Sequence, residues 1–179
     1  MPYSALESFD KEQLLEYVQS LLWQYRVVDA FWFLKAEEEF GRPMAEELNM
    51  RVWSKAGQLG VRDIIKRFGP FEVGEGETPI DVFLRVYQYY PWHVLAPFTE
   101  ERTGPDELML TMSDCPPQVA RLSRNLGEYH CKGMHLAEFT GLLPAIHPQL
   151  RVECVYAPLD PHPEDHFCRW RIYVDRDAS

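Results

Sequence analysis

The sequence feature that most constrains the fold is a change of hydrophobic period at Tyr89-Tyr90-Pro91-Trp92. Before this segment the apolar residues recur every three or four positions, the spacing of amphipathic helices, and after it they alternate with polar residues as in strands. The predicted order is three helices, two strands, two helices and two strands. This order favours the α+β class, with N-terminal helices packed with a four-stranded antiparallel sheet and two further helices. Because the composition shows no break, we predict a single domain over residues 1–179, mainly helical over 1–90 and α+β over 91–179.

Three helices are predicted in the N-terminal half, between the N-cap Asp10 and Gly41, over residues 43–67 and from residue 78 onward. The first of them is either one long helix or two helices with a slight bend between them. Asp10 and Gln13 form a capping box at the start of the first helix. Gly57 and Gly60 lie inside the second helix and indicate either a break or a close crossing with another helix.

The C-terminal half is predicted to contain a hairpin, two helices and two further strands. We place the hairpin strands at 94–102 and 107–113, the helices at 117–124 and 132–143, and the last strands at 150–156 and 167–174. The helix over 132–143 is expected to end before Pro144, since proline removes a helical hydrogen bond.

All four cysteines lie in this half, at Cys115, Cys131, Cys154 and Cys168. Strand alternation places Cys154 and Cys168 on buried faces, while Cys115 follows a strand and Cys131 starts a helix. Four thiolates fill the tetrahedral shell of zinc, so a structural zinc site made of all four is one hypothesis. The alternatives are four ordinary core thiols, because buried free cysteine packs as a small apolar residue, or a redox or disulfide role.

Candidate catalytic residues are Asp29, His130 and Cys131. Asp29 lies among apolar neighbours, where desolvation would raise its pKa and suit it to general acid–base catalysis. Cys131 would serve as a nucleophile if a base such as His130 activated it. We interpret Glu37 and Glu38 as part of a solvated helix end.

Candidate ligand-binding residues are Trp32, Tyr90, Gln118 and Arg121. Gln118 and Arg121 are one helical turn apart, and the guanidinium fork of arginine suits a substrate carboxylate. The aromatic residues around Tyr90 are suited to line a pocket for a flat ligand. The alternatives are a solvated helix surface for the first pair and ordinary core packing for the aromatic residues.

The arrangement of Cys131, Cys154 and Cys168-Arg169-Trp170 resembles the 4-vinyl reductase domain, a small α+β module of phenol-sensing transcription activators and chlorophyll-pathway proteins. In those sensors, three such cysteines and one acidic residue hold a structural zinc beside an aromatic-ligand pocket. The acidic ligand there precedes the middle cysteine by three positions. Arg151 occupies that position here and cannot bind a metal, so the resemblance implies that Cys115 supplies the fourth ligand.

Two further segments, 29–34 with Glu37-Glu38 and 114–121, resemble an uncharacterised family related to L-2-amino-thiazoline-4-carboxylic acid hydrolases. Those enzymes open a cyclic C–N bond with water. The resemblance covers nearly the whole chain and implies a hydrolase of a small cyclic amide or amidine. It assigns no catalytic residue position by position.

The bulk properties exclude some classes of protein. A net charge of -10 argues against nucleic-acid binding, which requires a basic face. No apolar run approaches the roughly 20 residues that cross a bilayer, and residues 1–4 do not begin a signal peptide, so we expect a cytoplasmic protein with reduced thiols and no membrane association.

The sequence therefore favours a small-molecule-binding α+β domain with a Cys-ligated zinc next to an apolar, aromatic pocket. The first alternative is a hydrolase acting on a non-peptide C–N bond of a small cyclic substrate. The second is a non-catalytic homodimer formed through Phe31 and Phe33. The identity of the ligand is not encoded in any motif of the chain.

Overall fold

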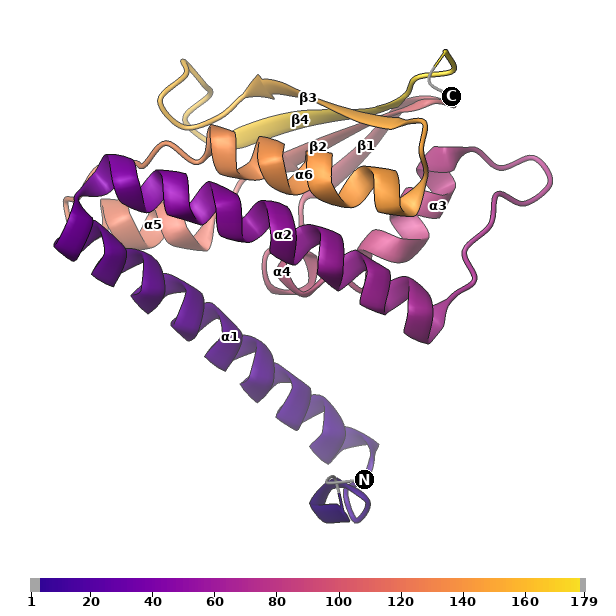
Figure 1. Cartoon of the computed structure of the whole chain (residues 1–179), viewed down its shortest axis with the longest axis horizontal. Coiled ribbons are helices and arrows are strands. Elements are labelled where there is room, and N and C mark those ends of the chain that lie inside the picture. The colour runs from indigo at the N-terminus through magenta and orange to yellow at the C-terminus, as the bar shows by residue number, and fades with distance from the viewer. Residues whose placement is uncertain (1–3, 178–179) are drawn as a thin grey trace.

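The computed structural model describes residues 4–177 and confirms the α+β class, with N-terminal helices and a four-stranded antiparallel sheet (Figure 1). Residues 1–3, part of the predicted non-signal N-terminus, lie outside the described residues. The helices are a short 3-10 helix at Ser4–Leu6, α1 at Lys11–Phe40, α2 at Arg42–Phe68, α3 at Pro79–Tyr87, α4 at Pro91–Leu95, α5 at Pro116–Leu122 and α6 at Lys132–Ile146. The strands are β1 at Thr99–Gly104, β2 at Glu107–Met112, β3 at Leu150–Tyr156 and β4 at Cys168–Val174. No helix within residues 4–177 is long and apolar enough to pass through a membrane.

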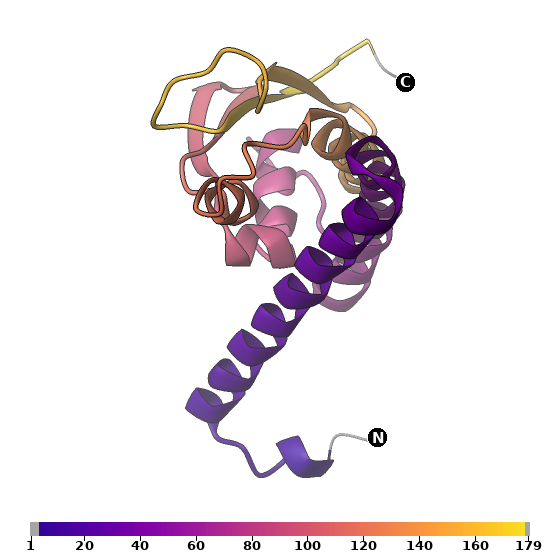
Figure 2. The same cartoon turned by 90° about the vertical axis from the view of Figure 1, so that its left-hand side faces the viewer.

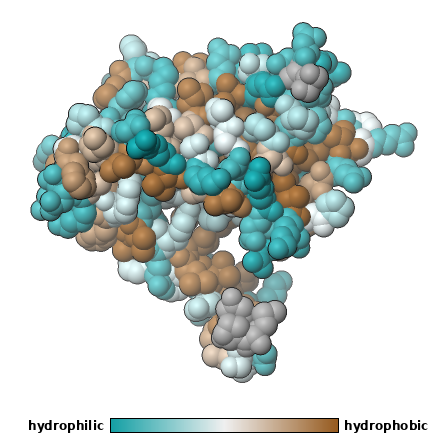
Figure 3. Space-filling view, in the orientation of Figure 1, coloured by the Kyte–Doolittle hydropathy of each residue, from teal (hydrophilic) through white to brown (hydrophobic). Residues whose placement is uncertain are grey.

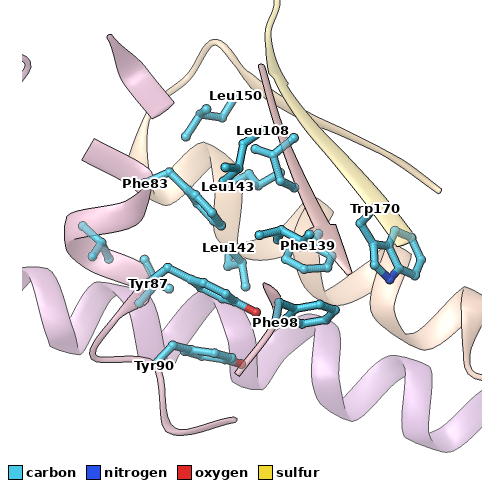
Figure 4. Close-up of a cluster of buried hydrophobic side chains, with 14 of the residues drawn as sticks. Phe83, Tyr87, Tyr90, Phe98, Leu108, Phe139, Leu142, Leu143, Leu150 and Trp170 are labelled. Atoms are coloured by element: carbon cyan, nitrogen blue, oxygen red, sulfur yellow. The ribbon is translucent and has the colours of Figure 1, made fainter. Parts of the chain in front are cut away.

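The sheet has the strand order β1-β2-β4-β3, and each neighbouring pair is antiparallel. Helix α6 lies beneath the sheet, and α2 lies on the other side of α6 (Figure 1). Between the sheet and the helices is the main core, where Phe83, Phe139 and Trp170 are almost fully buried (Figure 4). Tyr87 and Tyr90 belong to the same core, and their hydroxyl groups point the same way.

Glycines allow α2 and α6 to pack at close range. A Cβ atom at Gly141 of α6 would lie 2.5 Å from the backbone oxygen of Ser54, and one at Gly57 of α2 would lie 3.1 Å from Cγ of Glu138. Of the two predicted meanings of Gly57, the close crossing is confirmed, since α2 continues without a break to Phe68.

Helix α1 is continuous over 30 residues and begins with the predicted Asp10–Gln13 capping box. Its C-terminal half lies against the body of the molecule, where Phe33 and Ala36 are buried against Tyr129 and Cys131. Its N-terminal half projects away from the body (Figures 1 and 2). The end of the chain nearest Ser4 is therefore far from the sheet.

The predicted strand over 94–102 is wrong in its first part, because Pro91–Leu95 forms helix α4. Proline at the first helical position, after Tyr90 with extended backbone, starts a helical turn. The apolar alternation at Ala96 and Phe98 instead reflects two residues buried after that helix.

The predicted end of the helix before Pro144 is also wrong, because α6 continues through Pro144 to Ile146. Leu142 and Leu143 are almost fully buried just before the proline. Their packing outweighs the one helical hydrogen bond that proline removes.

Candidate functional site

Two adjoining cavities lie beneath the C-terminal half of α1. The inner cavity has a volume of about 60 Å³ and is lined from α1, α2, α6 and the chain around α4. The outer cavity has a volume of about 210 Å³ and lies between α1 and α5. Both cavities are lined by Asp29, Asn49, Trp92, Pro116, Pro117 and Tyr129, which form the wall they share.

Asp29 of α1 is the charged residue in this shared wall. Its Oδ1 accepts a hydrogen bond from Nε1 of Trp53 at 3.1 Å. Burial raises the pKa of Asp29 to about 6; the Trp53 hydrogen bond partly opposes this, and the negative charge of Glu138 adds to it. The group therefore changes its charge close to neutral pH.

Glu138 of α6 is the second acidic group, and it lies at the inner cavity. Its side chain is buried and accepts a hydrogen bond from the Tyr90 hydroxyl at 2.7 Å, while His135 Nδ1 lies 3.2 Å from the other carboxylate oxygen. Burial raises the pKa of Tyr90, and the neighbouring Glu138 charge raises it further. The Tyr90 hydroxyl thus stays protonated and donates to the carboxylate.

Asn49 of α2 contributes an unused acceptor. The residue is 4% exposed, and its Oδ1 atom has no hydrogen-bond partner. Buried polar atoms are nearly always hydrogen-bonded, so an unpaired oxygen in a cavity wall indicates a position where a donor from a ligand or water fits. Together with Asp29 it makes the shared wall rich in acceptors.

Aromatic rings surround these acceptors. The rings of Tyr25, Trp53 and Trp92 contact each other, with centroid separations of 6.1, 6.1 and 5.8 Å. Tyr129 lines both cavities and packs against Phe33 at 5.0 Å. Such rings offer flat apolar faces to a ligand and a negative quadrupole to a cation.

The structure brings three of the predicted cysteine ligands together beneath the sheet. Cys131 and Cys168 are buried and Cys115 is half-buried, and the three lie close enough for their charges to interact. Desolvation is the main cause that raises each pKa, to about 11 for Cys115 and about 12 for Cys168. Cys154 is half-buried and interacts with Cys168 and with Lys132. All four are free thiols.

Within residues 4–177, no group of three or more His, Cys, Asp or Glu side chains is arranged to hold a metal ion. The cysteines as placed therefore do not fit the predicted zinc shell, although three of them lie in one buried region. Cys131 also lacks the features of a nucleophile, because burial raises its thiol pKa well above the usual range.

Gln118 and Arg121 both bind groups of the chain itself. The amide of Gln118 is fully buried, donates to the Tyr129 carbonyl at 3.0 Å and accepts from the Tyr129 N–H at 3.2 Å. Arg121 holds both carboxylate oxygens of Glu37, at 2.8 and 3.2 Å, and also donates to the Gly127 carbonyl. The fork that we predicted for a ligand carboxylate thus holds Glu37, which is not the solvated helix end we expected. Arg121 still lines the outer cavity.

The other predicted site residues lie outside the two cavities. His130 is exposed, and its backbone N–H donates to Glu46, so it does not share the burial of Cys131. Trp32 is partly exposed on α1. Tyr90 does not line the inner cavity itself, but its hydroxyl donates to Glu138, which does. The cavities bring together Asp29 and the aromatic residue Trp92.

Sequence reasoning missed Asn49, Trp53, Glu138 and His135. One signal was available, because Glu138 falls on the same helical face as Phe139 and Leu142, and a carboxylate within an apolar stripe indicates a buried acid. His135 precedes it by one turn, which places the two side chains in contact. Asn49 carried no such signal.

The fold and the site define an α+β domain with a buried, acidic and aromatic cavity. The chain belongs to a family of unknown function (DUF6125), whose profile matches residues 7–174. None of the curated proteins matches the chain.

Among solved structures, the chain is similar to a trafficking protein particle complex subunit 3 from Naegleria fowleri covalently bound to palmitic acid, with a TM-score of 0.46 and 9% sequence identity. The similarity covers 86% of this chain and 99% of that chain. At this level it carries no statement about function, and the fatty acid belongs to that protein.

Proposed function

We propose that this chain is a small-molecule-binding domain whose ligand occupies the two adjoining cavities. The observation that carries the proposal is the shared wall, where the carboxylate of Asp29 and the unpaired Oδ1 of Asn49 lie among aromatic rings. Binding sites in proteins are typically apolar cavities with a few convergent polar groups and a perturbed pKa. This wall has each of these features.

The acceptors specify the chemistry of the ligand. Asp29 and Asn49 offer oxygens, so the ligand presents N–H donors, as an amine, amidine or amide does. The rings of Trp53 and Trp92 favour a flat group, and a cation is favoured further by their π faces. A volume of about 210 Å³ in the outer cavity lies below the roughly 300–1,000 Å³ typical of drug-sized ligands, so the ligand is small.

Two probes of equal size and opposite charge test the proposal. Benzamidine carries a planar N–H cation, whereas benzoate carries a planar anion, and tryptophan fluorescence reports on Trp53 and Trp92 in the cavity wall. We expect benzamidine to bind at least about tenfold more tightly than benzoate, a difference of about 1.4 kcal/mol. Isothermal titration calorimetry gives the same comparison without relying on fluorescence.

The matched variants are Asp29→Asn and Asp63→Asn. The first should remove the preference for benzamidine, while the second changes an exposed carboxylate on α2 and should leave it unchanged. If neither probe alters fluorescence, calorimetric heat or melting temperature in the wild type, the proposed binding function is wrong.

A second candidate function, hydrolysis of a small cyclic amide or amidine, is favoured by the pKa of Asp29. A general base works best when its pKa is near the operating pH, and Asp29 reaches about 6 beside a cavity that admits N–H donors. The test is turnover of a 2-amino-thiazoline-4-carboxylate, monitored through the loss of its ring. Asp29→Asn should abolish turnover without unfolding the chain, and a wild type that consumes no such substrate removes this candidate.

A zinc ion bound by the cysteines stays a separate prediction, as do the cytoplasmic location and the absence of membrane and nucleic-acid partners. What supports zinc is that the buried Cys131 and Cys168 and the half-buried Cys115 lie in one region. Their sulfur atoms would have to approach one another more closely to form a metal shell, because the described residues contain no such group. Elemental analysis of purified protein tests this prediction. One zinc per chain supports it, and no zinc contradicts it.

A further inference from the structure

The N-terminal half of α1 has an exposed apolar surface, on which Leu14, Leu15, Val18 and Leu21 are between 40% and 54% exposed. This half of the helix projects from the body, and of the described elements it has beside it in both views the short 3-10 helix Ser4–Leu6 (Figures 1 and 2). Brown, hydrophobic side chains are visible in the angle between this end and the body (Figure 3). An isolated helix is only marginally stable in water, since most helical stability in proteins comes from packing of an apolar face.

The predicted Phe31–Phe33 dimer surface is divided by the fold. Phe31 is 60% exposed, whereas Phe33 is buried against Tyr129. Both side chains line the outer cavity, but only Phe31 is open to a partner, so an interface on α1 must use other residues.

Six of the eleven exposed large apolar residues of α1 follow a heptad pattern. They recur alternately at four and three positions, which places them on a single seam of the kind found in coiled coils. All six are between 37% and 68% exposed, and one of them, Tyr25, also contacts Trp53 and Trp92 of the body at one edge of the seam. The residues of this heptad seam are Leu14, Val18, Leu21, Tyr25, Val28 and Trp32.

The positions beside the heptad seam carry a single charge, that of Asp29. Leu15, Tyr17, Leu22, Gln24 and Phe31 are uncharged, and the Asp29 carboxylate lies in the cavity wall, hydrogen-bonded to Trp53. In coiled coils, charges at the flanking positions select a different partner and set orientation, so their near absence favours a self-complementary pairing.

The segment is also nearly neutral. Residues 11–28 contain two basic residues, Lys11 and Arg26, and two acidic residues, Glu12 and Glu16, and Asp29 brings the net charge of residues 11–32 to -1, in a chain of net charge -10. This is a surface on which two copies of an acidic chain can meet with little mutual repulsion.

We propose that the heptad seam binds the same seam of a second copy, antiparallel, in a two-fold symmetric dimer. One register pairs every seam residue: Leu14 with the partner's Trp32, Val18 with the partner's Val28, and Leu21 with the partner's Tyr25. In this register the projecting half of each α1 lies along the body-proximal half of the other. The same patch serves both copies, as a closed two-fold interface requires.

Sedimentation velocity of the full chain tests the dimer. We expect the wild type to sediment as a dimer and Leu21→Asp to raise the dissociation constant at least tenfold, because it places a charge at the centre of the seam. The matched control is Trp23→Asp on the opposite side of the same helix, where the side chain is 63% exposed and should not affect association. Near-ultraviolet circular dichroism checks that the body of each variant stays folded.

Cysteine cross-linking tests the orientation. A mixture of Val18→Cys and Val28→Cys chains should form a disulfide between the two variants, whereas Val18→Cys alone should not link to itself. Self-linking of Val18→Cys indicates a parallel pair and overturns the proposed register. A wild type that remains monomeric at high micromolar concentration overturns the dimer and leaves the seam to a helix of another protein. A Leu21→Asp variant that dimerises equally well shows that the dimer forms through another surface and overturns the seam as its interface.

Discussion

Burial shifts the pKa in the same direction at the Asp29 carboxyl of the cavity wall and at the thiols beneath the sheet, but the consequences are opposite. Desolvation raises the pKa of Asp29 from 3.8 to about 6, into the range where proteins work. The same effect raises the pKa of Cys115 from 9.0 to about 11 and that of Cys168 to about 12, far outside that range. Burial therefore makes the acid responsive near neutral pH and makes the thiols unreactive, so the chemistry of this chain is expected at the carboxylates.

The largest effect on stability is expected from a change that disturbs the close packing of α6, which carries Glu138, against α2. Gly141→Ala places a Cβ atom 2.5 Å from the Ser54 backbone oxygen and should push α6, with Glu138, away from α2. We expect a loss of about 2–3 kcal/mol in the free energy of unfolding, measured by urea denaturation.

The control for this change is Gly133→Ala on the same helix, where the nearest atom is Met50 Sδ at 3.6 Å. That variant should be neutral or slightly stabilising, by up to about 1 kcal/mol, since alanine favours the helix. Equal losses in the two variants would show that the helix crossing is not what makes Gly141 important.

A second prediction concerns the sign of the carboxylate response to pH. The folded chain holds the Asp29 proton more strongly than the unfolded chain, so the contribution of Asp29 to wild-type stability, measured against Asp29→Asn, should fall as pH rises from about 4 through 6 and then level off. Asp29→Asn has no proton to lose and keeps an acceptor for Trp53. Above pH 6 the variant should be more stable by up to about 3 kcal/mol, from roughly two pKa units at about 1.4 kcal/mol each.

Denaturation curves between pH 4 and 8 measure this difference. Asp63→Asn, at an exposed carboxylate, serves as the control and should track the wild type. Parallel curves for Asp29→Asn and the wild type across this range would contradict the assigned role of burial.

The smallest effects are expected at the thiols, and they distinguish packing from metal binding. Cys131→Ala removes a buried side chain and should cost about 1–2 kcal/mol, whereas Cys154→Ala changes a half-buried one and should cost less than about 1 kcal/mol. A zinc shell made by all four cysteines would instead make the two losses similar and large. Thermal denaturation with and without a chelator measures both.

Local signals in the sequence predicted most of the fold. The period change, the capping residues and the glycines of α2 each act within a few residues, and the helices and strands that they predict are present. Helix α4 and the passage of α6 through Pro144 were missed, because there tertiary burial of residues such as Leu143 overrides a local preference.

The site was less predictable because its contacts are non-local. Asp29 could be selected as a charged residue among apolar ones, and the structure places it in the cavity wall. Glu138 pairs with Tyr90 across 48 residues, and Arg121 pairs with Glu37 across 84. Neither periodicity nor spacing in the sequence identifies which distant residue will pair with a given charged or hydrogen-bonding group.

One continuous helix carries both Asp29, in the cavity wall, and the heptad seam. A continuous helix tilts as one rigid body, so a ligand that moves the C-terminal half of α1 over the cavities also moves its N-terminal end. If two copies associate through that end, thermodynamic linkage requires reciprocity: whatever factor ligand binding applies to association, association applies to ligand affinity. Ligand binding and dimerisation would then be coupled through the angle between α1 and the body.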